Sequence, residues 1–265
     1  MINEVGTMQE AKFLTRSRVH HYAGRFYRQI LSRFNRNNLS RLAQVFGSDK
    51  FGKHFYTPHY EFHFAPIQRK RLTILEIGIG GYENRYKGGG SLRMWKSYFP
   101  GSRIYGIDLF DKSELDERRI KTFRGDQTDE TFLRDVVLAE TGPPDIIIDD
   151  GSHINSHVIT TFRILFPHLA EKGIYVVEDT QTSYWENVLD VDWGGSTDLD
   201  AVHTSMNFFK SLIDGLNHEE FAAPIRDPDY FDRHIVAMHF YHNLIFIEKG
   251  ENNEGSNVIK RRDAA

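Results

Sequence analysis

The sequence predicts an α/β fold in which a mostly parallel sheet of seven strands ends in an antiparallel hairpin. From residue 71 onward, short apolar runs alternate with segments of helical periodicity. The runs are continuous rather than alternating with polar residues, as expected for parallel strands covered on both faces. The last two runs, His234–Tyr241 and Leu244–Gly250, are separated by two residues. So short a link can join only antiparallel strands.

The elements follow one another in regular order along the chain. The strands expected to be parallel are Leu72–Gly78, Arg103–Phe110, Lys121–Asp126, Asp145–Asp150 and Gly173–Asp179. Helical patterns lie between them, at Gly90–Phe99, Asp129–Gly142 and Ser156–Leu169. Pro100 and Gly101 end the first of these helices, because proline and glycine interrupt helical periodicity.

Composition narrows the class of protein. The chain has 265 residues, 40% of them hydrophobic, which suits one domain with a small appendage. A net charge of −4 gives the chain as a whole no nucleic-acid footprint, and the absence of cysteine excludes disulfides and thiolate metal sites. There is no apolar run near the ~18 residues that cross a bilayer and no signal-peptide core. We therefore expect a soluble cytoplasmic protein.

Three regions are expected. Residues 1–45 hold eight Lys or Arg against two acids, and apolar residues recur at helical spacing at Val19, Tyr22, Phe26, Ile30 and Phe34. This pattern predicts a basic amphipathic helix that packs on the main domain or on a second subunit. The alternative is peripheral contact of residues 16–36 with an anionic membrane. Residues 46–250 form the α/β domain, and the polar stretch 251–265 is expected to be a disordered tail.

The loop after the first strand, "EIGIGGYE", indicates which cofactor the domain holds. Gly78 and Gly80 fit the first two positions of a dinucleotide fingerprint, but the third position is Glu83. A pyrophosphate seat is therefore poorly supported, whereas Glu76 suits a cofactor with a cationic amine and no phosphate. S-adenosylmethionine is such a cofactor, and the class I methyltransferases that use it have a Rossmann-like sheet with the predicted hairpin. Ser91, at the start of the next helix, is placed to reach the methionine carboxylate or to act as the N-cap.

Two further acids follow successive strands. Asp108 ends the second strand, where a carboxylate can accept both ribose hydroxyls. Asp126 follows the third strand and is placed to meet the adenine amino group. The alternative for each is a helix cap or a solvated loop acid.

Four carboxylates mark the ends of the fourth and fifth strands, at Asp149, Asp150, Glu178 and Asp179. The carboxyl ends of parallel strands share one edge, and the turns there can aim Asp150, Glu178 and Asp179 together. No Lys or Arg is near them in sequence, so a divalent cation would offset their repulsion. Oxygen ligands favour Mg²⁺, with Mn²⁺ as a substitute. The alternative is an acidic strand edge that caps the following helix.

Two histidines follow this edge. His153 is the nearest titratable group to Asp150 and is predicted to be the general base, since a neutral imidazole accepts protons near pH 7. His157 should point away from the strand edge. Their spacing resembles that of a zinc helix, but position 154 is Ile154 where that motif has its glutamate. Capping or surface solvation is the alternative for His153.

Taken together, the motifs resemble the metal-dependent sugar O-methyltransferases that modify macrolide antibiotics and related glycosylated natural products. The resemblance covers roughly Leu39–Gly250 and rests on "FGSDKFGKHFYTPHYE", "LEIGIGGYENRYKGGGSLRMW", "IYGIDLFDK", "IIIDDGSH", "VVEDTQTSYW", "DGLNHEEF" and "YHNLIFIEKG". Enzymes of this size also resemble mycobacterial methyltransferases that act on sugars of glycolipids or polysaccharides. The macrolide enzymes carry a large additional N-terminal domain, where this chain has its short basic lead.

The resemblance implies roles for individual residues. Asp150, Glu178 and Asp179 match the family's metal ligands and His153 its general base. The residues that match the cofactor pocket are Glu76, Asp108, Asp126 and Asp149. The family works with magnesium and forms homo-oligomers, so a homo-oligomer is expected here.

We expect methyl transfer from S-adenosylmethionine to a sugar hydroxyl of a glycosylated natural product, glycolipid or polysaccharide, with Mg²⁺ binding the acceptor hydroxyls. The alternatives are a catechol-type methyltransferase and a non-catalytic S-adenosylmethionine-binding module. The long segment Tyr184–His203 carries aromatic residues suited to stacking on sugars and is a candidate lid.

Overall fold

A seven-stranded sheet organises the computed structural model, which describes residues 27–223, 225–256 and 258. Its strands are β1 (Thr73–Ile77), β2 (Arg103–Asp108), β3 (Ile120–Arg124), β4 (Ile146–Asp149), β5 (Ile174–Glu178), β8 (Ile235–Tyr241) and β9 (Leu244–Lys249). They lie in the order β3-β2-β1-β4-β5-β9-β8. Strands β1 to β5 are parallel, and β9 pairs antiparallel with both β5 and β8. The predicted fold class is therefore confirmed, hairpin included.

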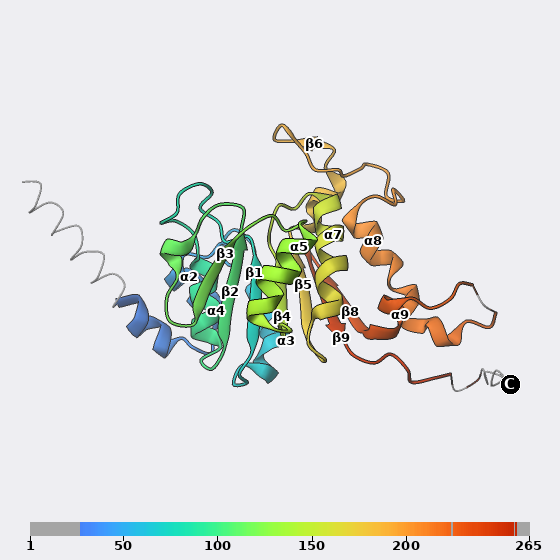
Figure 1. Ribbon diagram of the computed structural model, residues 1–265, viewed down its shortest axis with the longest axis horizontal. Helices are drawn as coiled ribbons and strands as arrows, with labels where there is room; N and C mark the ends of the chain where they lie inside the picture. Colours follow the sequence, from blue (N-terminus) through green and yellow to red (C-terminus); the bar gives the residue numbers. More distant parts are fainter. Residues whose placement is uncertain (1–26, 224, 257, 259–265) are drawn as a thin grey trace, which may run out of the picture.

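Helices connect the strands and cover the sheet (Figure 1). The α-helices are α2 (Leu39–Phe46), α3 (Thr57–Phe64), α4 (Gly90–Tyr98), α5 (Glu130–Phe132), α6 (Ala139–Thr141), α7 (Asn155–Leu165), α8 (Ser205–Ser211) and α9 (Tyr230–His234). Short 3₁₀ segments are η1 (Ala65–Ile67), η2 (Ser113–Leu115), η4 (Phe166–His168), η5 (Thr180–Tyr184) and η6 (Asp214–Glu220). A π-helical stretch, η3 (Leu133–Leu138), interrupts the helix that the sequence predicts at 129–142.

The two faces of the sheet carry separate hydrophobic cores. On one face, apolar side chains of α2, α3 and α4 pack against alternate strand residues such as Ile74, Ile148 and Val176. On the other, η3, α7 and α8 cover the intervening residues, among them Leu75 and Ile147. Because strand side chains alternate between faces, neighbouring acids at a strand end point to opposite sides. That alternation decides where each site residue lies.

The predicted N-terminal helix is only partly described. Residues 27–34 are helical. Of the predicted apolar stripe, Ile30 and Phe34 are 38% and 86% exposed, while Val19, Tyr22 and Phe26 lie outside the described residues. The stripe's role in a subunit or membrane contact stays a prediction, as does disorder of the tail, most of which also lies outside those residues. No helix in the described ranges has the length and apolarity needed to cross a membrane.

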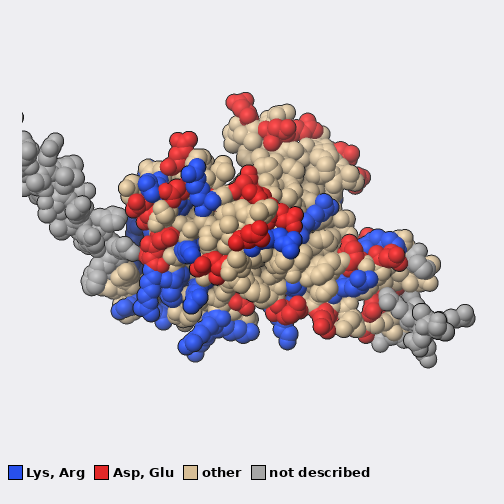
Figure 2. Space-filling view, viewed as in Figure 1, with Lys and Arg blue, Asp and Glu red and all other residues tan. Residues whose placement is uncertain are grey.

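The segment 184–203 leaves the sheet as an arm that includes β6 (Asn187–Val188) and β7 (Val191–Asp192), at the top of Figure 1. Its two tryptophans, Trp185 and Trp193, contact each other edge to face at 6.0 Å. The arm has five acidic residues and no Lys or Arg. Figure 2 shows acidic side chains gathered on this projection, while both signs are mixed over the body below it.

Candidate active site

A cavity of about 1180 Å³ opens at the edge of the sheet where the parallel strands end. Loops that follow β1, β2, β3, β4 and β5 all contribute to its wall. Of the residues predicted from the sequence, those that line it are Gly78, Gly80, Ser91, Asp108, Asp126, Asp150, His153 and Asp179. The fold thus brings cofactor, metal and base candidates to one hollow.

The first turn depends on a glycine. Gly78 has a φ of +84°, and a Cβ atom there would lie 1.9 Å from the backbone carbonyl oxygen of Asp150. No L-residue with a side chain fits that space, because nonbonded atoms do not approach so closely. The glycine therefore allows the loop after β1 to touch the loop that carries the metal candidate.

Asp108 and Asp126 both face the cavity, and both also order their own loops. Asp108 accepts hydrogen bonds from the backbone N–H groups of Ile79, at 3.1 Å, and Phe110, at 2.9 Å. Asp126 accepts from the backbone N–H and the hydroxyl of Thr128, each at 2.8 Å. These two bonds lower the pKa of Asp126. These hydrogen bonds orient both carboxylates at the cavity wall, where the ribose and the adenine are expected to bind.

Glu76 lies behind the cavity wall and does not line it. Its side chain is fully buried on the face covered by α4, where it accepts a hydrogen bond from Ser91 at 2.7 Å. Burial raises the pKa of Glu76, against the opposing effect of Lys50. Ser91 is not the N-cap of α4, since that position is Gly89. A direct contact of Glu76 with a cofactor amine would require this pair to separate.

Asp149 is also set back, on the opposite face of the sheet. It is 1% exposed, and its carboxylate meets Gln127 Nε2 at 3.3 Å and the Tyr175 hydroxyl at 3.5 Å. Burial raises the pKa of Asp149 to about 7, with His153 and the Gly151 N–H acting in the other direction. The structure therefore places Asp149 beneath the cavity rather than in its wall.

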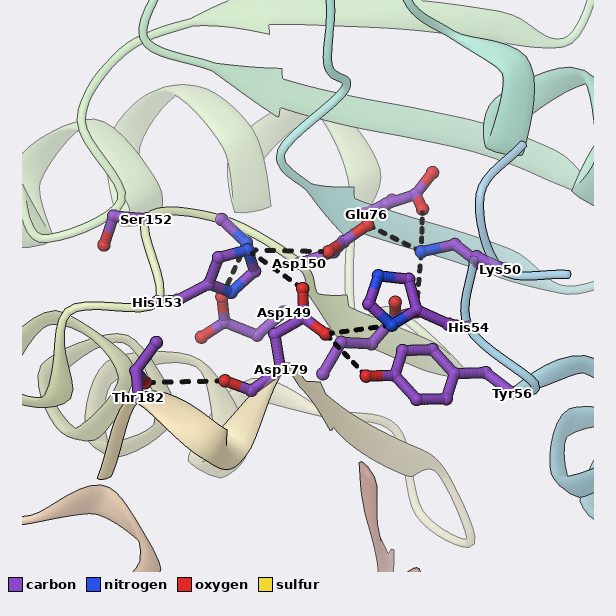
Figure 3. A network of polar contacts seen from close by, with 12 residues as sticks. Lys50, His54, Tyr56, Glu76, Asp149, Asp150, Ser152, His153, Asp179 and Thr182 are labelled. Carbon is purple, nitrogen blue, oxygen red and sulfur yellow. Dashed lines mark hydrogen bonds and ion pairs between the residues drawn. The ribbon is translucent and has the colours of Figure 1, made fainter. Parts of the chain in front are cut away.

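Asp150, His153 and Asp179 converge in the lining of the cavity (Figure 3). Their ligand atoms all lie within 4.8 Å of one another. His153 Nε2 is 3.8 Å from Asp150 Oδ1 and 3.6 Å from Asp179 Oδ2. His153 and Asp179 have left-handed backbone, with φ of 57° and 55°. These turns aim both side chains back over the strand ends.

A lysine that sequence reasoning missed sits among the carboxylates. Lys50 Nζ is 2.6 Å from both Asp150 Oδ2 and Glu178 Oε1, and 3.2 Å from Glu76 Oε1. Burial by itself would lower the pKa of Lys50, but the three carboxylates raise it well above its ordinary value. No Lys or Arg is near these acids in sequence, but one lies among them in space. Lys50 arrives from the segment before α3.

Two tyrosines complete the polar network. Tyr60, on α3, donates its hydroxyl hydrogen bond to Glu178, and Tyr56, just before α3, donates to Asp179 at 2.5 Å. Desolvation, strengthened by these acidic acceptors, raises the pKa of both tyrosines. Glu178 is thus occupied by Lys50 and Tyr60 and stays out of the Asp150, His153 and Asp179 group. Tyr56 and Tyr60 are four residues apart, a spacing that places side chains on the same face of a helix. This spacing is the signal in the sequence that could have identified the pair.

His157 does not point away from the site. It lines the cavity and its Nδ1 lies 3.0 Å from the Ser152 hydroxyl. The expectation that it faces away is wrong, because His157 lies in the first turn of α7, which begins at Asn155, and this turn borders the cavity. His157 lies close enough to Asp126 to help lower its pKa, whereas His153 lies beside Asp150 and Asp179.

Comparison with known proteins adds independent information, although no family model matches the chain. The mycinamicin VI 2''-O-methyltransferase of Micromonospora griseorubida is 50% identical over 221 residues, which are 82% of this chain and 54% of the relative. A tetracenomycin-C rhamnosyl 2'-O-methyltransferase of Streptomyces olivaceus is 47% identical over 227 residues, 85% of this chain and 58% of the relative.

A solved structure agrees with these relatives. The MycE methyltransferase of the mycinamycin pathway, in complex with Mg, SAH and mycinamycin VI, superposes with a TM-score of 0.75 at 48% identity. The match covers 83% of this chain and 56% of that one. The chain spans about half the length of the curated relatives it matches.

Proposed function

Over the region that aligns, the chain belongs to the sugar O-methyltransferases that use S-adenosylmethionine and magnesium, and we propose that it methylates a sugar hydroxyl of a glycosylated small molecule. The observation that carries the proposal is the convergence of Asp150, His153 and Asp179 in the lining of a cavity with a glycine turn and a strand-end acid. One end of that cavity suits a donor, and the other suits an acceptor that must lose a proton.

The donor end fits S-adenosylmethionine. Asp108 is the last residue of β2 and lines the cavity, where its carboxylate would accept the ribose hydroxyls. Gly78 and Gly80 let the backbone approach the cofactor closely, and Asp126 would meet the adenine amino group. When bound, the cofactor supplies an electrophilic methyl group on a sulfonium.

The acceptor end fits a hard divalent cation. Asp150 and Asp179 present oxygens within 4.8 Å, the donor type that Mg²⁺ prefers. Four carboxylates surround this edge, because Glu76 and Glu178 lie beside Asp150 and Asp179. The single positive charge of Lys50 offsets only one of their four negative charges. Room for further positive charge therefore remains beside Asp150 and Asp179. Glu178 would join as a third ligand if its carboxylate turned from Lys50, and the bound ion would lower the pKa of coordinated hydroxyls.

His153 is proposed as the general base. Its imidazole stands at the cavity wall between the two aspartates, and its Nε2 lone pair accepts the proton of the attacking hydroxyl. As the carbon–oxygen bond forms, the carbon–sulfur bond breaks and its electrons stay on sulfur. The products are the methyl ether, SAH and protonated His153. Asp150 and Asp179 then stabilise the imidazolium.

The acceptor is proposed to be an uncharged sugar on a hydrophobic scaffold. The two relatives act on a macrolide and on a rhamnosylated tetracenomycin, by their names. The acidic arm 184–203 supports an acceptor without phosphate or sulfate, since like charges repel. Its aromatic side chains, including the 46% exposed Tyr184, would contact the acceptor if the arm closes.

The test is methyl transfer in solution. The purified chain is incubated with labelled S-adenosylmethionine, Mg²⁺ and a panel of glycosylated macrolides and polyketides, their aglycones, and simple catechols. Label in the sugar of a glycosylated acceptor supports the proposal. Label only in catechols, or S-adenosylmethionine binding without transfer to any acceptor, would count against it.

A further inference from the structure

A second group of metal-ligating side chains lies away from the cavity, where α3 packs on the edge hairpin β8–β9. It consists of His63 from α3, His239 from β8 and Glu248 from β9. Glu248 Oε1 is 3.3 Å from His239 Nε2 and 3.7 Å from His63 Nδ1. One ligand atom from each residue lies within 4.8 Å of the others. The lining of the cavity includes none of the three.

The imidazole of His63 is fixed in a ligating orientation. Its side chain is 3% exposed and stacks on Phe246, with ring centroids 4.1 Å apart. Its Nε2 lies 3.0 Å from the Tyr241 hydroxyl. A tautomer that keeps the proton on Nε2 donates to Tyr241 and leaves the Nδ1 lone pair facing Glu248. Metal-binding histidines are held in this way, with the second nitrogen donating to a neighbouring oxygen.

Two of the three separations, those between Glu248 and each histidine, lie near the values for a small tetrahedral ion. Zinc bonds of roughly 2.0–2.1 Å place adjacent ligand atoms roughly 3.3–3.5 Å apart on a tetrahedron. The measured values of 3.3 and 3.7 Å come close to that spacing without rearrangement. In the part of the chain that the structure describes, the ion pairs of Glu248 are with His63 and His239 and with no Lys or Arg. A cation at this point therefore competes with no ammonium or guanidinium for the carboxylate.

We propose that His63, His239 and Glu248 form a second metal site, with zinc as the ion that its ligand set favours. Two imidazoles and one carboxylate suit borderline ions such as Zn²⁺, whereas Mg²⁺ prefers the oxygens of Asp150 and Asp179. Three protein ligands leave the fourth position for water. The two sites thus select different ions by the chemistry of their donors.

The site joins a helix to a hairpin next to the catalytic edge. His63 lies three residues after Tyr60, whose hydroxyl binds Glu178. Glu248 lies near one end of β9, and at the other end Leu244 pairs with Glu178 of β5. An ion at the site would hold α3 on β8–β9 and so hold Tyr60 against Glu178. Its role is structural support, separate from methyl transfer.

Metal titration of the whole chain tests the site. Protein is stripped with chelator, dialysed and saturated with Mg²⁺ to fill the oxygen-rich site. It is then titrated with Zn²⁺, and with Co²⁺ as a probe whose visible absorption reports tetrahedral coordination. We expect one tightly bound equivalent and a rise in Tm. His239→Ala should weaken zinc binding by more than roughly 100-fold, which exceeds the effect of removing a residue that only hydrogen-bonds to a metal ligand. It should also remove the rise in Tm.

Matched variants keep the test decisive. His242→Ala removes an exposed histidine from the turn of the same hairpin and should bind zinc as the unmodified chain does. Glu248→Gln keeps the shape of the side chain and should lose binding as His239→Ala does. The proposal would be overturned if His239→Ala and Glu248→Gln bound zinc as tightly as the unmodified chain does. It would also be overturned by a chain that binds no zinc once Mg²⁺ is present, which would leave the three residues as an ion-pair cluster.

Discussion

The ammonium group of Lys50 lies 2.6 Å from the carboxylate of Asp150, although the two residues are 100 positions apart in the chain. The same nitrogen is 2.6 Å from Glu178. Lys50 therefore acts as an internal counter-ion for the acidic edge, beside the place where a divalent cation is proposed to bind. Its backbone is held by the turn before α3, where its carbonyl accepts from Tyr56 N at 3.1 Å.

Replacing Lys50 by methionine should destabilise the metal-free protein by roughly 3–5 kcal/mol, since it leaves buried carboxylates without their partner. Added Mg²⁺ should reduce that loss by supplying positive charge at the same edge. Urea unfolding with and without Mg²⁺ measures both effects. Lys53→Met, at an exposed position in the same segment, is the control. Equal stabilities for the two variants would mean that Lys50 is not the counter-ion.

His153→Ala should lower kcat by at least roughly 100-fold while the dissociation constant of S-adenosylmethionine changes by no more than a few-fold, because a positioned base acts on the proton and not on the donor. His157→Ala is the matched variant. His157 lines the cavity beside Ser152, so its loss should affect cofactor affinity more than kcat. Steady-state kinetics and calorimetric titration separate the two. A near-normal kcat in His153→Ala would remove it from the role of base.

Removal of divalent metal should abolish turnover and leave cofactor affinity nearly unchanged. All four acids line the cavity, but Asp150 and Asp179 are proposed to hold the metal at the acceptor, while Asp108 and Asp126 are proposed to bind the donor. Activity after EDTA treatment and dialysis, then after Mg²⁺ or Mn²⁺ addition, is the measurement. Full turnover in the metal-free enzyme would contradict the assignment and leave the acids with a structural role.

Asp108→Ala should weaken S-adenosylmethionine binding by about 1.5–3 kcal/mol for each charge-assisted hydrogen bond lost. Asp111→Ala, which removes an exposed acid paired with Arg85 a short distance away, should leave the affinity unchanged. Calorimetric titration compares the two. Indistinguishable affinities for both variants would place the ribose elsewhere.

The pH dependence of stability should carry the signature of Asp149. Its pKa is raised to about 7 by burial in the folded protein, against an ordinary value near 3.8. The folded state therefore binds the proton more tightly, and stability falls as pH rises from about 4 to about 7. The variant Asp149→Asn has no ionisable group at this position and should not show this loss of stability. Its stability relative to the unmodified protein should therefore be greater at pH 8 than at pH 5. Denaturation of both metal-free proteins at the two pH values measures the difference, and parallel curves would contradict it.

The sequence predicted the strands closely because each strand is a local apolar run whose ends are marked by polar residues. Strand β4, expected at Asp145–Asp150, is Ile146–Asp149, and β9, expected at Leu244–Gly250, is Leu244–Lys249. The shared edge of parallel strands also predicted that Asp150, Glu178 and Asp179 lie close together. Asp150 and Asp179 do converge, with His153 beside them, whereas Glu178 is bound by Lys50 and Tyr60.

Contacts between distant segments could not be predicted in this way. The turn before α3 gives no periodic signal. Lys50 was therefore not expected beside acids that are far away in the sequence, such as Glu178, which follows it by 128 residues. The placement of Glu76 and Asp149 behind the wall follows from strand alternation, which depends on the exact end of each strand. The π-helical η3 reflects tertiary packing rather than local propensity.

His153 and Asp179 hold their side chains on left-handed backbone, which glycine adopts freely and which costs other residues roughly 1–2 kcal/mol each. Selection for stability alone would favour glycine at both positions, whereas the roles proposed for His153 and Asp179 require their side chains. The surrounding fold must supply the free energy that keeps the two turns in place. Under the proposed function, conformational stability is given up for reactivity at this edge of the sheet. Substitutions that stabilise the protein elsewhere should therefore widen the range of changes that the edge tolerates.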